Sequence, residues 1–569
     1  MSTGFFLKLK HAFPDAGRML KAFKSPVAAD RRLAIDARIV VIGIGPAAVS
    51  MLSELNKAGF RNVTIVSRDK LFGGKCVNFG CMPIEFVLTL DDSDPQGNRQ
   101  KLGDFVAALR GDVEAQIKSF GYNHIEASAL RVSEQSLVLQ TGEILSFDRL
   151  IVASGGSYPP PANLPDASKV VSIEDFWNLP IGSRVSIYAE DNVTALTLGD
   201  VALRLGLVPT VILGRVNPLA HMPSFKYFAR RLAQRGVKIY EKARIERIGA
   251  NEIQLEAGKS VAVAFDYLLP FNRAVPNFIE VDGRIPEIFD IDLVRAALPG
   301  RPDVIFLGDG GGMMTASESD LQARWLMRSW KLGEPLDFKA MNALPVSLHA
   351  ETSLALVGEP WTFTATNWAE VDFRALGWSR AHALEGKLWY ILSPETGKIE
   401  AIHICHKYAA ELISLAAALM SYPVWDHRWV TSTVHPTAAE IFKIVADQAM
   451  NALPKPETSQ ITAADISSEF TLPSLECIDG DEALPSWLTR AQWQEIVLSN
   501  TPFIQLSVLY GISKLEEATG QTYSRHIDLS SLDRVRLRND PSVVISVFPD
   551  EQVTQVRHAE NSIKVLYRQ

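Results

Sequence analysis

The segment from Gly73 to Pro83 most constrains what this chain can fold into, because it holds Cys76 and Cys81 with four residues between them. About one turn of helix brings side chains at this spacing onto the same face, where two sulfur atoms can form a disulfide. Gly73 and Gly74 leave the backbone open to the close approach of a flat ligand. The pattern predicts a redox-active cysteine pair beside a two-electron carrier.

A glycine-rich turn lies upstream of the cysteines. The apolar run from Arg38 to Ile42 opens into Gly43-x-Gly45-x-x-Ala48, and helical spacing follows from Val49 to Ala58. This order predicts a strand, a phosphate-binding turn and a helix. The glycine motif alone is weak evidence, and its place before the cysteine segment makes it specific.

The two motifs together resemble the opening of the flavoprotein disulfide reductases, which include glutathione reductase, dihydrolipoamide dehydrogenase and mercuric reductase. The resemblance implies that the disulfide lies against the isoalloxazine ring of FAD. It gives Cys76 the exchange with substrate and Cys81 the position nearer the ring. The expected FAD contacts in these two motifs are Gly43, Gly45, Ala48, Gly74 and Lys75.

Three further segments fit the FAD site of the same family. The strand from Val63 to Val66 ends at Ser67, where the family has an acid that binds the adenosine ribose, so a hydroxyl is expected to substitute in part. The run from Leu150 to Gly156 resembles a family strand and places Ser154 and Gly155 at the cofactor. Val304 to Asp309 resembles the strand whose aspartate holds the ribityl chain.

The family also has an NAD(P)H domain, and this chain departs from its glycine fingerprint. The strand from Arg184 to Tyr188 and the helix from Leu196 to Leu205 are expected. The turn from Ala189 to Leu196 has no glycine and carries Glu190 and Asp191. Side chains there would block the backbone's approach to a pyrophosphate, and the carboxylates would repel it. The sequence predicts that the domain is retained and the nucleotide site is lost.

A second departure concerns a lysine and a glutamate that form an ion pair near the flavin in the family. Ile84 and Glu85 stand where the lysine is expected, and Thr197 stands where we align the glutamate. Joint loss of both partners indicates a rebuilt pocket, because losing one alone would strand a buried charge. A misalignment of one or two residues is the alternative.

A histidine motif completes the resemblance. In the family, a His-Pro-Thr segment reaches from one subunit into the disulfide site of the other, and Val434 to Glu440 keeps that pattern. The resemblance implies that His435 is the acid/base for the thiols and that Glu440 orients it. His403 and His406 flank Cys405, but this strand pattern is more typical of a dimer core than of a metal site. We expect no metal.

The predicted fold is α/β, with two Rossmann-like domains, an α+β dimerisation domain and an α+β appendage. In the appendage, Ile504 to Thr519 predicts a helix, and Ser542 to Phe548 and Ser562 to Tyr567 predict a pair of strands. The expected domains are an N-terminal extension at 1–35, an FAD domain at 36–170 and 268–340, an NAD(P)H-like domain at 171–267, a dimerisation domain at 341–455, and a linker with a small domain at 456–569.

The charge and cysteine content of the chain limit which kinds of partner and which cellular compartment are expected. The net charge of −8 gives no bulk attraction to nucleic acid. Four cysteines are too few for a disulfide scaffold, so Cys405 and Cys477 are expected to be reduced in a cytoplasmic protein. Residues 1–35 are basic and amphipathic, which is typical of a helix that binds a membrane surface or a partner, or that packs on its own protein.

The function hypothesis is therefore a homodimeric, FAD-dependent thiol/disulfide oxidoreductase that does not use NAD(P)H. Its substrate would be a small dithiol or disulfide or a protein-bound thiol, and oxygen or a protein would exchange electrons with the flavin. One alternative is an NAD(P)H-dependent disulfide or metal-ion reductase that binds its nucleotide in an atypical way. The other is a flavin-bound interaction protein without catalysis.

Overall fold

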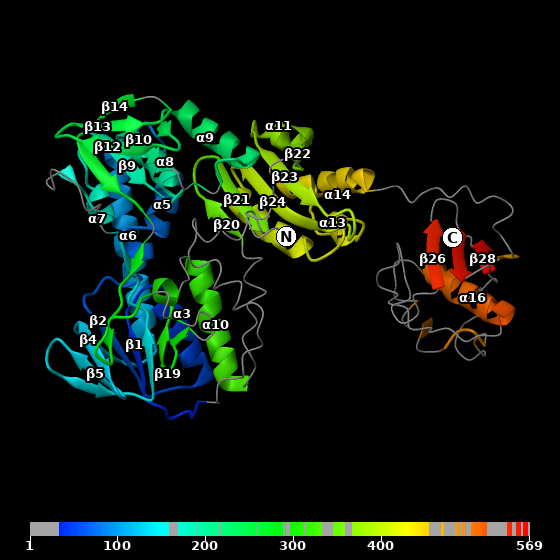
Figure 1. The fold of residues 1–569 in the computed structure, drawn as a ribbon, viewed down its shortest axis with the longest axis horizontal. Helices are drawn as coiled ribbons and strands as arrows, with labels where there is room; N and C mark the ends of the chain where they lie inside the picture. The colour runs from blue at the N-terminus through cyan, green and yellow to red at the C-terminus, as the bar shows by residue number, and fades with distance from the viewer. Residues whose placement is uncertain are drawn as a thin grey trace. The chain divides into compact units, whose positions relative to one another are not determined.

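The computed structural model (Figure 1) describes most of the chain as far as residue 453 and parts of the remainder. The N-terminal arm, Asp191 and Cys477 lie outside the described residues. No helix among the described residues is long and apolar enough to cross a membrane. The described residues are 33–158, 169–332, 345–358 and 367–453, apart from 191, 215–216, 218, 259, 273, 288–290, 292–295 and 312–314, together with 468–471, 484, 486–489, 492–493, 496, 502–519, 543–548, 553–558 and 561–566.

The chain divides into two compact units. The first comprises residues 1–392, 399–421 and 433–441, and the second comprises 393–398, 422–432 and 442–569. The first unit holds three successive sheets with their helices. It contains all of the motifs on which the sequence analysis rests.

The first domain is built on a six-stranded sheet with the strand order β18-β19-β7-β1-β2-β3. The strands are parallel except β18, which runs antiparallel to β19. The apolar runs of the central strands β1 and β7 are buried on both faces, as is typical of parallel sheets. The strands are β1 (Ile39–Ile42), β2 (Val63–Ser67), β3 (Asn123–Glu126), β7 (Arg149–Val152), β18 (Ala297–Leu298) and β19 (Arg301–Phe306).

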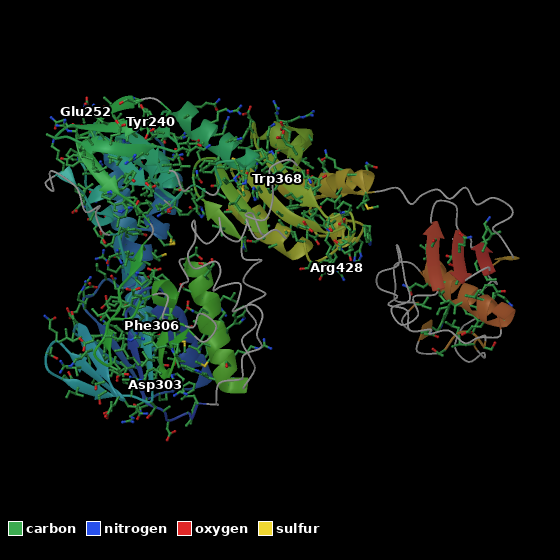
Figure 2. All side chains as sticks on the ribbon, viewed as in Figure 1. Tyr240, Glu252, Asp303, Phe306, Trp368 and Arg428 are labelled. Carbon is green, nitrogen blue, oxygen red and sulfur yellow. The ribbon has the colours of Figure 1, made fainter. Side chains whose placement is uncertain are left out.

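Helices cover one face of this sheet, and a small sheet packs on the other. Helices α3 (Pro46–Ala58) and α10 (Ala316–Leu332) lie side by side on the first face (Figure 1). The opposite face includes Phe306, which is fully buried and is labelled with Asp303 in Figure 2. The small sheet has the order β17-β4-β5-β6, from β4 (Ala129–Ser133), β5 (Ser136–Leu139), β6 (Ile144–Ser146) and β17 (Glu280–Val281).

The remaining elements of this domain surround the cysteine segment. Asp94 caps the long helix by accepting a hydrogen bond from the backbone N–H of Gly97 at 2.9 Å. The elements are α4 (Gly74–Asn78), α5 (Cys81–Leu88), α6 (Pro95–Ser119), β8 (Gly156–Ser157), α7 (Ile173–Phe176), β16 (Val275–Pro276) and the 3₁₀ turn η3 (Gly308–Gly311).

The second domain contains a parallel four-stranded sheet in the order β11-β10-β9-β15. Between β11 and β15, the chain forms an antiparallel three-stranded sheet in the order β12-β13-β14. Strand β15 pairs with β9 and forms the edge of this sheet. The elements are β9 (Arg184–Ala189), α8 (Ala195–Arg204), β10 (Val208–Leu213), α9 (Pro223–Arg235), β11 (Lys238–Tyr240), β12 (Arg244–Ile248), β13 (Glu252–Glu256), β14 (Ser260–Ala264) and β15 (Tyr267–Pro270).

The third sheet is antiparallel, with the order β20-β21-β24-β23-β22. Its central strands are almost fully buried, and α12 packs against β21 and β24. The elements are β20 (Val346–Leu348), β21 (Ser353–Gly358), β22 (Ala369–Asp372), η5 (Phe373–Ala375), α11 (Gly377–Ala381), β23 (Lys387–Leu392), β24 (Ile399–His406), α12 (Ala409–Leu419) and η6 (Ala438–Glu440).

An ion network ties the three sheets of the first unit together. Arg235, at the end of α9, lies 2.6 Å from Asp200 and 2.7 Å from Asp92, and it also pairs with Glu351. Asp200 is fully buried and accepts a further hydrogen bond from the backbone N–H of Glu351 at 2.8 Å. Arg204 lies 2.9 Å from Asp92. Burial raises the pKa of Asp200, although the charge of Arg235 opposes it. The positive charge of Arg235 therefore helps to keep the buried Asp200 ionised.

The second unit contains a small α/β sheet with the order β25-β28-β27-β26, and α16 packs on β27 and β28. The helix expected at 504–519 is confirmed. The two expected strands both form, but they do not pair with each other because β27 lies between them. The elements are α13 (Arg428–Thr431), α14 (Ile441–Ala452), β25 (Ser468–Thr471), α16 (Pro502–Thr519), β26 (Val543–Phe548), β27 (Val553–His558) and β28 (Asn561–Leu566).

Candidate active site

The cysteine segment forms two short helices at the carboxyl end of β1. Cys76 lies in α4 and Cys81 begins α5. Gly73 and Gly74 have φ values of +82° and +57°, a region that glycine adopts without a Cβ penalty. The buried Asn78 donates hydrogen bonds to the Phe72 carbonyl at 3.1 Å and the Gly74 carbonyl at 2.8 Å. These bonds fix the turn that carries the sulfurs.

The thiols of Cys76 and Cys81 interact with each other, and the interaction shifts their pKa values in opposite directions. Both are free in the structure, with Cys76 partly buried and Cys81 exposed. The interaction with Cys76 lowers the pKa of Cys81 to about 7, and burial opposes this effect. The same interaction, followed by burial, raises the pKa of Cys76. Cys81 is therefore the thiol of the pair that ionises first.

The glycine turn after β1 makes a cradle that a side chain would fill. A Cβ on Gly43, which has φ +107°, would overlap the Ala153 carbonyl. A Cβ on Gly74 would lie 2.8 Å from the Cα of Gly45, so these two backbones touch. Ala48 is fully buried in α3 behind the turn. The close packing of bare backbone at the start of a helix fits a pyrophosphate, so this part of the structure fits FAD.

Two other strand ends open toward the same edge of the sheet. Ser154 donates a hydrogen bond to the Asn277 carbonyl, and Gly155 has φ +69°. Asp309 lies in η3 after β19, where burial raises its pKa and the charge of Lys75 lowers it. These positions follow β7, which pairs with β1, and β19, which lies next to β7, so both stand at the same carboxyl edge of the sheet as the glycine turn.

Tyr158 is a residue of this site that the sequence did not single out. It stacks on Phe271 with ring centroids 4.8 Å apart, and the Lys75 ammonium lies 5.0 Å from its ring centre. Burial raises the pKa of Tyr158 to about 12, and the charges of Asp309 and Cys81 add to the effect. No motif marks it, because one aromatic residue after a strand is ordinary core.

Ser67 lies at the end of β2, the position that the sequence indicates. Its side chain is buried at the end of β2, where its Oγ lies 2.8 Å from His124 Nε2 and donates to the Asp69 carbonyl at 2.9 Å. Asp69 itself accepts a hydrogen bond from the Leu71 N–H at 3.1 Å. Both polar side chains at this strand end are thus engaged within the protein.

The positions of the family's lysine and glutamate hold a different arrangement. Helix α5 packs against α8, where Ile84 joins an apolar cluster and Thr197 is buried. Glu85 instead forms an ion pair with His349, whose Nδ1 lies 2.8 Å from Glu85 Oε2. His349 comes from the turn after β20, and no sequence motif indicated it. An ion pair is therefore present near Cys81, but it is formed by Glu85 and His349 and not by a lysine and a glutamate.

Glu190 occupies the turn after β9, where a nucleotide would be sought. Its carboxylate accepts a hydrogen bond from the Tyr188 hydroxyl at 2.5 Å, and its backbone N–H donates to Asn272 Oδ1 at 2.8 Å. Asn192 Oδ1 accepts a hydrogen bond from the Thr194 N–H at 3.2 Å, ahead of α8. Local side chains thus contact backbone donors that a phosphate would use.

His435 and Glu440 are brought together as the motif indicates. The Nδ1 of His435 lies 3.0 Å from Glu440 Oε1, and the histidine side chain is 78% exposed. Glu440 also accepts a hydrogen bond from the backbone N–H of Thr437 at 3.3 Å, which fixes the carboxylate. A carboxylate on Nδ1 leaves Nε2 as the ring nitrogen directed outward.

The histidines around Cys405 are core residues. His403, Cys405 and His406 are fully buried, and among the described residues no cluster has the composition of a metal site. His403 Nδ1 lies 2.8 Å from the Ser224 hydroxyl, and its ring packs 4.3 Å from that of Trp368, which Figure 2 labels. Burial lowers the pKa of His403 to about 3 and that of His406 to about 4.

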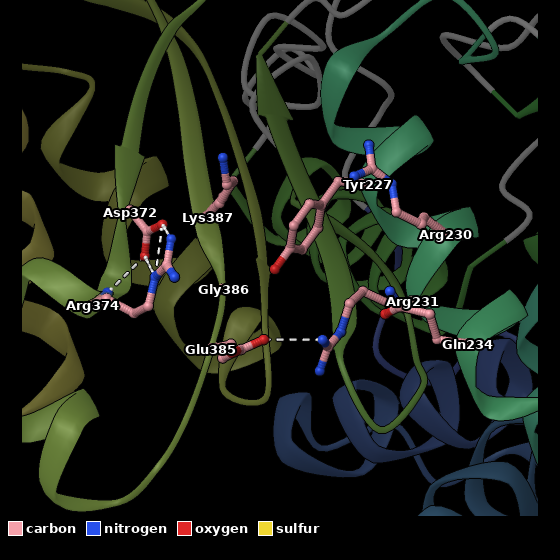
Figure 3. Close-up of a pocket in the computed structure, with 9 residues that line it drawn as sticks. All are labelled: Tyr227, Arg230, Arg231, Gln234, Asp372, Arg374, Glu385, Gly386 and Lys387. Atoms are coloured by element: carbon pink, nitrogen blue, oxygen red, sulfur yellow. Dashed lines mark hydrogen bonds and ion pairs between the residues drawn. The ribbon is translucent and has the colours of Figure 1, made fainter.

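A separate cavity of about 200 Å³ lies between α9 and the β22–β23 region, as Figure 3 shows. Its charges are largely compensated: Arg231 lies 3.0 Å from Glu385, and Arg374 lies 2.6 Å from Asp372. It has no thiol or imidazole, so it is not the redox site. The lining residues are Tyr227, Arg230, Arg231, Gln234, Asp372, Arg374, Glu385, Gly386 and Lys387.

Residues 37–272 match the family model described as pyridine nucleotide-disulphide oxidoreductase. The dihydrolipoyl dehydrogenase of Bacillus subtilis is 22% identical over 452 residues, which cover 71% of this chain and 96% of that protein. The mitochondrial dihydrolipoyl dehydrogenase of Sus scrofa is 25% identical over 470 residues, with 72% and 90% covered.

Solved structures of similar proteins share the fold. The HOCl-induced flavoprotein disulfide reductase RclA from Escherichia coli has a TM-score of 0.62 at 19% identity, covering 72% of this chain and 99% of that one. LpdA from Mycobacterium tuberculosis has a TM-score of 0.60 at 19% identity, covering 74% and 100%. The predicted α/β fold with Rossmann-like domains is thereby confirmed.

Proposed function

Because this chain belongs to the flavoprotein disulfide reductases, we propose that it is an FAD-dependent oxidoreductase that exchanges electrons between thiols and a disulfide formed by Cys76 and Cys81. The observation that carries the proposal is the placement of Cys76 in α4 and Cys81 at the start of α5, beside the glycine cradle, where the interaction with Cys76 lowers the pKa of Cys81 to about 7. A low thiol pKa supports redox chemistry because the thiolate is the reactive form.

The exchange assigns a separate role to each sulfur. A substrate thiolate attacks Sγ of Cys76 in the disulfide form, and the sulfur–sulfur bond breaks to release Cys81 as a thiolate. A second substrate thiol then breaks the mixed disulfide, which releases Cys76 and oxidises the substrate. Bound FAD would take the electron pair that the two reduced sulfurs carry. Gly43, Gly45, Ala48 and Gly74 would hold its pyrophosphate, with Asp309 at the ribityl chain.

Proton transfer in this scheme falls to His435 and Glu440. We propose a homodimer in which this pair serves the cysteines of the partner subunit. The exposure of His435 supports the proposal, since a side chain that is 78% exposed is available to another chain. Glu440 holds Nδ1, so Nε2 is the atom that would take the proton of the attacking thiol.

The electron partner of the flavin is proposed to be oxygen or a redox protein, and NAD(P)H is proposed to be a poor one. Two features support this: the Glu190 carboxylate in the turn after β9, and the ion pair of Glu85 with His349 in place of the family's lysine and glutamate. Each lost charged hydrogen bond is worth ~1.5–3 kcal/mol. A few such losses weaken binding by orders of magnitude, at ~1.4 kcal/mol per tenfold.

Rapid mixing of the oxidised, flavin-loaded full chain under argon tests the proposal. Dithiothreitol should produce a long-wavelength charge-transfer absorbance, whereas millimolar NADH or NADPH should leave the spectrum unchanged. Cys81→Ser should remove the absorbance and retain the flavin. Bleaching by NADPH within milliseconds would instead establish an ordinary nucleotide-dependent reductase. Absence of any response to dithiol would overturn the thiol chemistry.

A further inference from the structure

Glu85 lies on the same face of α5 as Cys81. The two residues are four positions apart in the helix Cys81–Leu88, so their side chains are neighbours one turn apart. In the family that the chain resembles, a basic residue is expected near this position. Here the side chain is acidic, and by itself it would disfavour a thiolate at Cys81, because its charge raises the pKa of that thiol.

His349 supplies the positive partner from a distant part of the same chain. Its Nδ1 lies 2.8 Å from Glu85 Oε2, and both side chains are partly exposed. The neighbours of His349 hold it in place: Leu348 and Ala350 are buried, and the Ala350 N–H donates to Ser353 Oγ at 3.2 Å. The imidazole therefore stands on an anchored turn.

The charges that face His349 all favour its protonated form. They come from Glu85 and Cys81 on α5 and from Glu411 on α12, and they raise the pKa of His349, with the hydrogen bond to Glu85 as the largest cause. The charge of His349 in turn lowers the pKa of Cys81. The remaining titratable groups that face Cys81 are Cys76, from α4, and Tyr158.

We propose that His349, held by Glu85, is the positioning residue that stabilises the thiolate of Cys81 from within the same subunit. The inference rests on the proposed thiol chemistry and adds a second carboxylate–imidazole pair to it. His435 and Glu440 would serve Cys76 from the partner subunit, while Glu85 and His349 serve Cys81. The positive charge near Cys81 is thus carried by an imidazole, which can lose its proton near neutral pH, whereas the family's lysine stays charged.

The test is a pH titration of the charge-transfer absorbance in the dithiol-reduced, flavin-loaded full chain. The absorbance should fall as the pH is lowered and Cys81 becomes protonated. His349→Gln should move the midpoint upward by about one pH unit, the size expected for removing one nearby opposite charge. His349→Lys should keep the midpoint close to that of the wild type. His382→Gln is the matched control, because this exposed histidine packs on Trp378 and has no contact with Cys81.

A second readout does not use the flavin. The rate at which iodoacetamide alkylates Cys81, followed by mass spectrometry of the labelled peptide, should show the same shift in its pH profile. An unchanged midpoint in His349→Gln overturns the inference, and if that variant does not fold, a raised midpoint in His349→Lys overturns it. A wild type with no charge-transfer absorbance at any pH overturns the proposed function instead, so the two failures are distinguishable.

Discussion

The Nδ1 atom of His435 lies 3.0 Å from Glu440 Oε1, in a segment whose histidine is exposed. The pair is rigid at one end, because the backbone N–H of Thr437 also holds the carboxylate. It is open at the other end, where the imidazole extends into solvent. An acid/base group built in this way is suited to act on atoms that its own chain does not supply.

His435→Ala should slow thiol exchange by roughly 10²-fold or more, the range for losing a positioned acid/base. Exchange is measured by stopped-flow reduction with a dithiol. His427→Ala is the control, since that histidine lies next to Asp426 in a different segment.

Subunit mixing distinguishes the proposed dimer from a site within one chain. Mixed dimers of His435→Ala and Cys76→Ser subunits contain one intact composite site if His435 serves the partner, so partial activity should return. No recovery after demonstrated subunit exchange would place His435 in the site of its own chain.

Gly74→Ala should weaken FAD binding by about tenfold or more. The new Cβ would lie 2.8 Å from the Cα of Gly45, and alanine resists a φ of +57° at a cost of ~1–2 kcal/mol. The measurement is a fluorescence titration of flavin-free protein with FAD. Gly103→Ala on α6 is the matched control, because no atom lies within 4 Å of its added Cβ. Equal affinity in both variants would count against the cradle.

Arg235→Ala should destabilise the first unit by about 2–4 kcal/mol, as when one partner of a buried ion pair is removed. Asp200 would keep its charge in a fully buried position, and Asp92 and Glu351 would lose a counter-ion. Urea unfolding at saturating FAD measures the change. Arg230→Ala, an exposed position on the same helix, should change stability by less than about 0.5 kcal/mol.

Acid should destabilise the third sheet through its buried histidines. Burial lowers the pKa of His403 to about 3 in the folded protein, whereas the ordinary pKa of a histidine is about 6.5. As the pH falls below 6.5, His403 becomes protonated in the unfolded chain but stays neutral in the folded chain. The free energy of unfolding should therefore fall by up to about 1.4 kcal/mol per pH unit for this residue.

Urea unfolding between pH 7 and pH 5 measures the slope. His403→Gln, which can still bond Ser224, should have a shallower slope than the wild type. Parallel slopes would mean that His403 does not contribute to the acid sensitivity.

The motifs that are contiguous in sequence were predictable. Local spacing defines the glycine turn at Gly43, the cysteine pair and the His435–Glu440 pair, and the structure forms each of them. Glu85 and Thr197 were identified as departures from the family. The contact of His349 with Glu85 could not be predicted from the sequence, because only the tertiary fold brings the end of β20 next to α5.

Other features depended on long-range packing. Strand β27 reads Val-Thr-Gln-Val-Arg-His, which is too polar to stand out, and the sheet forms it because β26 and β28 flank it on both sides. The contact of Ser67 with a histidine was another such feature. His124 lies on the neighbouring strand β3, and the parallel pairing of β2 with β3 brings its ring to Ser67.

The network around Asp200 has a mechanical consequence. Any rotation of the second domain away from the β20–β21 turn would part Arg235 from Glu351, and it would also break the bond between Asp200 and the Glu351 backbone. The network therefore opposes a hinge rotation of the second domain, because such a rotation would have to break these charged contacts together.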